Sequence, residues 1–177
     1  MRERYLSLAI SLTFSALSGS VYADLIQGPS SSASPYLVPV APGVDIISVM
    51  TVGDSVNAKP DGSPYRMVGL ADGLGVLRGD RDTFTVLMNH ELANTAGVTR
   101  AHGSLGSFVS KWTIKRDTLQ VIKGEDLIQQ AYLYDKTSGG YVLGNPLGFS
   151  RFCSADLPAT DAFLNKRSKK GTPERIF

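Results

Sequence analysis

Apolar residues recur along most of this chain in short runs that come close to strict alternation with polar ones. In the clearest run, Phe108, Trp112 and Ile114 are set mainly against polar neighbours. A further apolar pair follows across the short polar link Arg116-Asp117. Successive side chains of a strand point to opposite faces of a sheet, so this spacing predicts half-buried strands. The short link between them predicts a β-hairpin.

Other segments show the same short period and are separated by Asp-Gly, Gly-Asp, Gly-Gly and Asn-Pro turn signals. Further strands are expected at 44–52, 65–70, 84–88, 131–134 and 141–143. Only 127–130 and 161–166 have a helical pattern, and both are short. Many short strands with turns between them predict an all-β fold, as a sandwich, a barrel or a propeller, and periodicity alone does not choose among these.

Length and composition narrow the class of protein. The chain has 177 residues, of which 42% are hydrophobic and 19% charged, with 18 Gly and 9 Pro. This mixture is too apolar for a disordered protein and too interrupted for a helical bundle. The formal charge of +2 gives no basic footprint of a nucleic-acid binder. Cys153 is the one cysteine of the sequence, which excludes a disulfide scaffold.

The first 23 residues have the pattern of a secretory signal peptide. Arg2 and Arg4 precede a mostly apolar stretch at 5–17, and small residues follow up to Val21-Tyr22-Ala23. Serine and threonine interrupt the apolar stretch, which argues against the alternative of a membrane anchor. We expect cleavage after Ala23, no transmembrane segment, and export to the periplasm or the extracellular space.

The remaining chain divides into a lead-in and a folded part. Residues 24–43 are rich in Ser, Pro and Gly and are expected to be a flexible lead-in, and 44–177 are expected to fold. Residues 171–177 look like the beginning of a strand that is cut off. The chain is therefore expected to be the front part of a longer protein.

The most concentrated polar cluster is Asn89-His90-Glu91, directly after the strand expected at 84–88. A zinc protease needs a second His four residues after the first, and Asn94 stands there instead. Strand alternation places Asn89 and Glu91 on one face and His90 on the other. Amide and carboxylate oxygens suit calcium. The alternative is that this cluster closes a turn, with Glu91 in solvent.

Two further motifs carry candidate chemistry. Arg100-Ala101-His102-Gly103 has cationic side chains that complement phosphate, although a surface Arg and a structural His are the alternative. Cys153 is either a soft metal ligand or a buried small hydrophobe. The other carboxylates, at 61, 72, 80, 82, 125 and 126, are mostly interpreted as turn residues, and the basic run at 166–170 as a solvated face.

Four segments taken together resemble the bacterial PhoX-like alkaline phosphatases and phytase-like secreted propellers. They are Asp72-Gly73-Leu74-Gly75, Asn89-His90-Glu91, Arg100-Ala101-His102-Gly103 and Arg151-Phe152-Cys153-Ser154. The resemblance covers about 44–177 and implies a β-propeller that holds calcium and iron and hydrolyses phosphate monoesters. Cys153 then corresponds to an iron ligand and Glu91 to a carboxylate near the metals. This length supplies about two to three blades, a partial propeller.

The sequence also departs from that family, which commonly has a Cys-Glu-Glu motif where Ser154-Ala155-Asp156 follows Cys153 here. The expected function is therefore that of the N-terminal portion of an exported metal-dependent phosphatase, inactive without its missing C-terminal part. In it, Asn89, Glu91 and Cys153 hold metal, and Arg100 and His102 hold a small phosphorylated substrate. The alternative is a non-catalytic calcium-binding secreted or surface module.

Overall fold

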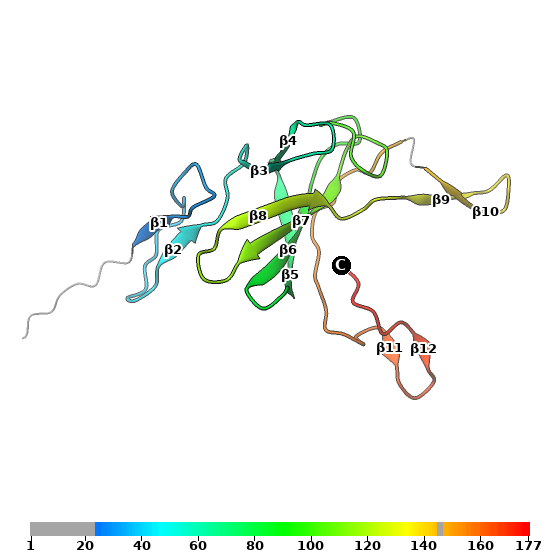
Figure 1. The fold of residues 1–177 in the computed structure, drawn as a ribbon. Helices are drawn as coiled ribbons and strands as arrows, with labels where there is room; N and C mark the ends of the chain where they lie inside the picture. Colours follow the sequence, from blue (N-terminus) through cyan, green and yellow to red (C-terminus); the bar gives the residue numbers. More distant parts are fainter. Residues whose placement is uncertain (1–23, 145–146) are drawn as a thin grey trace, which may run out of the picture.

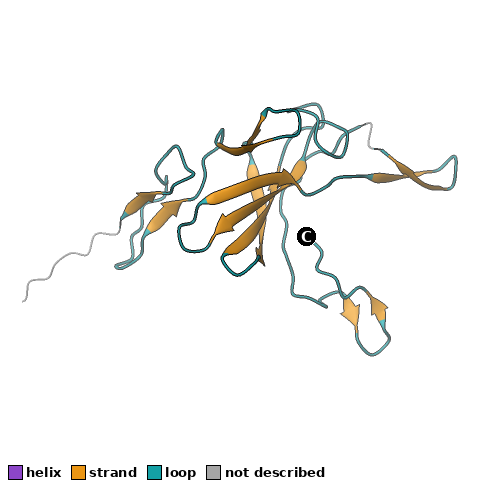
Figure 2. Cartoon of the chain, viewed as in Figure 1, coloured by secondary structure: helices purple, strands orange, loops and turns teal. Residues whose placement is uncertain are grey.

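A computed structural model describes residues 24–144 and 147–177, and every regular element in these residues is a strand (Figure 2). The predicted all-β class is confirmed. The two predicted helices are wrong, because 127–130 form an irregular link and 161–163 form a turn before a short strand. The segment predicted to be a signal peptide, 1–23, lies outside the described residues. In the part of the chain that is described, no helix has the length and apolar character to cross a membrane.

The centre of the fold is a four-stranded antiparallel sheet in which sequential strands are neighbours (Figure 1). Its strands are β5 (Ala71–Arg78), β6 (Thr83–His90), β7 (Phe108–Lys115) and β8 (Val121–Asp126). The predicted hairpin is confirmed as β7–β8, with Ile114 opposite Val121. Leu119 takes a left-handed φ of 56° in its turn, which lets the chain reverse.

Four two-stranded sheets surround this centre. They are the parallel pair β1 (Leu25–Gln27) and β2 (Ile46–Ser48), and the antiparallel pairs β3 (Ser55–Ala58) with β4 (Pro64–Arg66), β9 (Tyr132–Asp135) with β10 (Gly140–Leu143), and β11 (Leu164–Asn165) with β12 (Lys170–Gly171). Strand β1 lies inside the predicted flexible lead-in. The predicted strand at 171–177 is wrong beyond its first residue, since 172–177 have no strand structure. The sheets do not close into a ring within the described residues.

One face of the four-stranded sheet carries the apolar core. Trp112, Ile114 and Val121 pack there with Tyr65, which lies in β4, and Met67, which directly follows it. The rings of Trp112 and Tyr65 meet edge to face, with centroids 5.4 Å apart. The Trp112 indole nitrogen also donates to Ser110 Oγ at 2.7 Å, so its polar atom is satisfied.

The opposite face of the sheet is covered by a later segment that crosses β5 at two glycines. The amide of Gly73 donates to the carbonyl of Cys153 at 2.9 Å. A Cβ atom at Gly75 would lie 2.7 Å from Cβ of Leu157, and one at Gly73 would meet the backbone of Ala155 even more closely. Glycine in a strand allows this close approach of a second backbone. This crossing brings Cys153 to the sheet.

Candidate metal centre

Three potential ligand atoms gather where the 153–157 segment meets the sheet. A carboxylate oxygen of Asp72, a carboxylate oxygen of Glu91 and the Sγ of Cys153 all lie within 4.8 Å of one another. Among the described residues, this is the group of carboxylates, cysteine and histidine that meets the spacing for a metal ion. We call Asp72, Glu91 and Cys153 the thiol–carboxylate cluster.

Backbone pairing places the two carboxylates. Ala71 on β5 is opposite His90 on β6, so the following residue on each strand, Asp72 and Glu91, lies at the same end of the sheet. The amide of Glu91 donates to the carbonyl of Leu70 at 2.9 Å, which continues the pairing beyond the end of β6. Asp72 is exposed and Glu91 is half-buried.

Cys153 is an exposed free thiol, so the alternative that it is a buried hydrophobe is wrong. Its Sγ donates to the carbonyl of Arg151 at 3.2 Å. Hydrogen bonding to the Glu91 carboxylate raises the pKa of this thiol, and the negative charges of Glu91 and Asp72 act in the same direction. The cluster therefore accumulates negative charge, which a bound cation would neutralise.

One cation of the protein itself already lies beside the cluster. Nη1 of Arg151 is 3.3 Å from Oε1 of Glu91, and the Arg151 side chain is 64% exposed. An exposed pair of this kind contributes little to stability. A metal ion that uses this Glu91 oxygen has to displace the guanidinium group.

The donors fit a transition metal better than calcium. Thiolate and carboxylate together suit iron or zinc, whereas calcium prefers six to eight oxygens. Ligand atoms about 2.0–2.3 Å from a tetrahedral ion lie about 3.3–3.8 Å apart. Side-chain rotations that shorten the distances between the three ligand atoms by about 1 Å would bring them to that separation.

Asn89 occupies a supporting position next to this cluster. Its side chain is buried, and its Nδ2 donates to the carbonyl of Ser154 at 3.5 Å. Asn89 thus contacts the backbone that carries Cys153.

His90 points to the other side of the sheet, as strand alternation predicted. Its ring is fully buried and stacks on Phe108 with centroids 4.2 Å apart. Nδ1 lies 3.0 Å from the carbonyl of Val68 and Nε2 lies 2.8 Å from Ser110 Oγ. Desolvation by burial lowers the pKa of His90 to about 4, so the ring is neutral at pH 7.

Arg100 lies in a buried ion pair. Its Nη1 is 3.5 Å from Asp126 Oδ1, and its guanidinium carbon stands 3.5 Å above the centre of the Phe108 ring. Asp126 also accepts hydrogen bonds from the Tyr65 hydroxyl at 2.7 Å and the Ala101 amide at 2.9 Å. The sequence predicted an accessible anion site at Arg100. In the structure the Arg100 guanidinium is buried and is already paired with the Asp126 carboxylate.

His102 is also buried, with its ring against Phe149 at a centroid distance of 4.9 Å. Neither ring nitrogen has a hydrogen-bond partner among the described residues. Burial lowers its pKa. Among the described residues, Arg100 and His102 make no contact with the thiol–carboxylate cluster.

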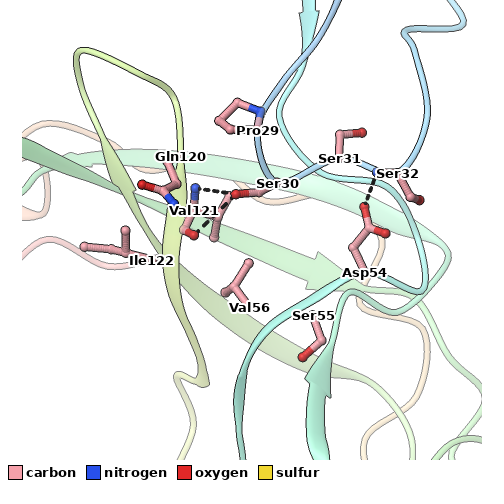
Figure 3. Close-up of a pocket in the computed structure, with 10 residues that line it drawn as sticks. All are labelled: Pro29, Ser30, Ser31, Ser32, Asp54, Ser55, Val56, Gln120, Val121 and Ile122. Atoms are coloured by element: carbon pink, nitrogen blue, oxygen red, sulfur yellow. Dashed lines mark hydrogen bonds between the residues drawn. The ribbon is translucent and has the colours of Figure 1, made fainter.

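A separate polar pocket of about 510 Å³ lies between the 29–32 turn, the start of β3 and the start of β8 (Figure 3). Ser30 Oγ accepts from the Val121 amide at 3.0 Å there. Asp54 is the carboxylate of this pocket and accepts from the amides of Ser32 and Thr51. The Ser30 hydroxyl and the Asp54 carboxylate already accept hydrogen bonds from backbone amides. The described residues of this pocket therefore form no cluster of reactive side chains.

Sequence reasoning missed Asp72 and Arg151 as parts of the site. Asp72-Gly73 was interpreted as a turn, whereas it lies inside β5. The available signal was the alternation of Gly73 and Gly75 with Leu74 and Val76, because spaced glycines in a strand mark a place where another backbone passes close by.

No family model, curated protein or solved structure matches this chain.

Proposed function

We propose that this chain binds a transition metal through Asp72, Glu91 and Cys153 and that the metal serves hydrolysis of phosphate monoesters in an exported, PhoX-like protein. The observation that supports metal binding is the convergence of three ligand atoms within 4.8 Å from positions far apart in the sequence. Iron is the metal we propose, because a thiolate ligand disfavours calcium and the sequence resemblance implies an iron-binding Cys.

The chemistry follows from charge. A bound metal ion polarises a phosphoryl oxygen and helps to position or activate the attacking oxygen. In this proposal Asp72 and Glu91 hold the ion, Cys153 binds as a thiolate, and Asn89 fixes the segment that carries Cys153. Arg151, once displaced from Glu91, offers an exposed guanidinium fork next to the metal for a second contact to phosphate.

The propeller belongs to the same proposal. An antiparallel meander of four strands is the unit that propellers repeat as blades. The sheet β5–β8 has this topology, and we propose that it is one blade, with the cluster at the end where β5 begins and β6 ends.

A second candidate is metal binding without turnover. It is favoured by the buried ion pair of Arg100 with Asp126, because Arg100 was the residue expected to hold phosphate. In that case the metal would join the 153–157 segment to β5 and β6, and its role would be structural.

The test begins with metal content. The chain should be purified, loaded with Fe²⁺ or Zn²⁺ under reducing conditions, and analysed by elemental analysis and a competition titration. We expect about one ion per chain, and at least a tenfold loss of affinity in Cys153→Ser and in Asp72→Asn. Asp61→Asn, an exposed turn carboxylate, is the matched control and should leave the affinity unchanged. Equal metal content in the cluster variants and the control contradicts the site.

The same titration tests the thiol and the guanidinium. Since the pKa of Cys153 is raised, thiolate binding releases a proton, and the affinity should rise about tenfold per pH unit between pH 6 and 8. Arg151→Gln should bind metal several-fold more tightly, because it removes the cation that competes for Glu91. A pH-independent affinity would show that the thiol is not a ligand.

Phosphatase activity separates the two candidates. Because the sequence predicts that this chain is inactive by itself, the assay uses the metal-loaded chain extended by its C-terminal part. That protein should hydrolyse p-nitrophenyl phosphate, and its Cys153→Ser variant should not. A stoichiometric, cluster-dependent metal with no turnover of any phosphate monoester in the extended protein would select the non-catalytic module.

A further inference from the structure

The hairpin β11–β12 stands apart from the rest of the molecule. It projects away from the four-stranded sheet (Figure 1), and neither of its strands contacts any other described strand. Its base is nevertheless fixed. The Asp161 amide donates to the Pro173 carbonyl at 3.2 Å, and Arg175 donates to the carbonyls of Leu157 and Pro158 at 2.8 and 2.7 Å. The hairpin therefore projects from the molecule, and hydrogen bonds hold its base in place.

The tip of this hairpin is cationic. Four basic residues fall within five positions and all of them are exposed: Lys166, Arg167, Lys169 and Lys170. Asn165 Oδ1 accepts from the amides of Arg167 and Ser168 at 3.1 and 3.0 Å, so the turn that presents them is hydrogen-bonded. The cationic groups are thus concentrated on one short turn and the first residue of β12.

Most of this charge is not neutralised by the protein. Lys166 pairs with Asp161 at 3.2 Å, while its side chain remains 75% exposed. Arg167, Lys169 and Lys170 form no ion pair with any described residue. The only other acidic residue between 158 and 177 is Glu174. A local excess of positive charge on a chain of net charge +2 points to an anionic partner.

An exposed apolar side chain belongs to the same hairpin as the cations. Phe163, immediately before β11, is 50% exposed. The carbonyl of Phe163 accepts from the Thr172 amide at 3.3 Å, so Phe163 is held at the base of the hairpin. A large apolar side chain in the same short hairpin as a basic cluster matches the boundary between lipid headgroups and acyl chains.

We propose that the β11–β12 hairpin docks on an anionic phospholipid surface, with its tip cations over the headgroups and Phe163 in the interface. A nucleic acid fits less well, because its binders carry a wider basic footprint and the exposed Phe163 would gain nothing from a phosphate backbone. The hairpin is separate from the thiol–carboxylate cluster, so this inference does not depend on metal binding or on turnover.

The test is co-sedimentation of the full chain with vesicles of phosphatidylglycerol and phosphatidylcholine. Binding should rise with the phosphatidylglycerol fraction and be lost in 0.5 M salt, because it depends on screened charge. Each basic residue near such a surface contributes about 1 kcal/mol, so Lys169→Gln combined with Lys170→Gln should lower the partition coefficient about 25-fold. Phe163→Ser should lower it several-fold without changing the salt dependence.

Matched controls remove the same groups elsewhere. Lys115→Gln combined with Lys136→Gln deletes two exposed or partly exposed cations from other hairpins, and Val40→Ser deletes an exposed apolar side chain. Both should bind vesicles like the parent chain. Equal loss in the controls overturns the assignment to this hairpin, as does vesicle binding that ignores the phosphatidylglycerol fraction. Tighter binding to a DNA duplex than to the vesicles at equal salt overturns the choice of lipid.

Discussion

At the scale of single residues, His90 shows how a polar side chain becomes part of a core. Both ring nitrogens have partners, Val68 and Ser110, and the ring lies flat on Phe108. On the other side of Phe108 the ring faces a cation, Arg100. Charging His90 would therefore place a second positive group in this buried stack, and the neutral form is strongly preferred.

The first prediction concerns acid stability. The pKa of His90 is lowered to about 4, whereas the unfolded chain protonates His near 6.5. Between these values the unfolded state binds more protons, so the free energy of unfolding should fall as the pH drops from about 6.5 towards 4. The fall should be up to ~3 kcal/mol from this residue. Nearby Arg100 acts in the same direction and Asp126 against it.

Urea unfolding at pH 7.5, 6 and 5 measures this dependence. His90→Gln should be less stable at pH 7.5 and should lose most of the slope below pH 6.5. His102→Gln is the comparison, since burial lowers the pKa of His102 as well and part of the slope belongs to it. A slope that is unchanged in His90→Gln would mean that His90 is not the titrating group.

The sequence predicted part of this residue-scale picture. Alternation separated His90 from Asn89 and Glu91, because orientation along a strand depends only on local geometry. It could not show that Arg100 would find Asp126, since that pair joins a loop to the end of β8 through tertiary packing. The placement of Cys153 beside Glu91 was suggested by a motif and not by periodicity.

At the scale of elements, β5 connects the sheet to the thiol–carboxylate cluster. Its two glycines face the segment that carries Cys153, and its first residues include Asp72. Any side chain at Gly73 would meet the backbone of Ala155 and Ser154, which cannot move as a flexible side chain does. The geometry of the cluster thus depends on a strand position that has no side chain.

The second prediction follows from this contact. Gly73→Ala should destabilise the chain by about 1–3 kcal/mol through overpacking and should weaken metal binding at least tenfold, because the segment with Cys153 is pushed away from the sheet. Gly140→Ala is the matched control in β10, where an added methyl group meets nothing within 4 Å. Urea unfolding and the metal titration measure both effects. Parent-like metal affinity in Gly73→Ala would show that the crossing does not position the thiol.

Elements with alternating side chains were predictable and the others were not. β6, β7 and β8 follow from residues such as Val86 and Trp112, whose period matches a sheet. β5 was missed because Gly73 and Gly75, which alternate with Leu74 and Val76, follow Asp72 and resemble turn signals. The helices predicted at 127–130 and 161–166 were wrong, because neither segment is long enough to form a helix without tertiary support.

At the scale of the whole molecule, stability is concentrated in the four-stranded sheet. Its core unites Trp112, Ile114 and Val121 with Tyr65 and Met67. The hairpins β9–β10 and β11–β12 contact no other described strand, and a two-stranded hairpin is marginal in water by itself. The sheet and the two hairpins are therefore expected to open with very different free energies.

The third prediction is a hierarchy of hydrogen exchange. Amides in the middle of β6 and β7 should exchange slowest, by global unfolding, while those of β9–β10 and β11–β12 should exchange by local opening at least a hundredfold faster. Exchange measured by mass spectrometry on peptic peptides resolves these segments. Protection in either hairpin equal to that of β6 would show that the hairpin is covered by a further contact.

The hydrogen bond from the Gly73 amide to the Cys153 carbonyl also bears on biogenesis. Its two ends lie 80 positions apart, so the intervening loop has to close before the bond can form. Until that loop has closed, the segment that carries the Cys153 thiol has no sheet to pack against. The thiol is open during that interval to oxidants and stray disulfide partners, and it gains its two acidic neighbours only when the sheet it returns to is already in place.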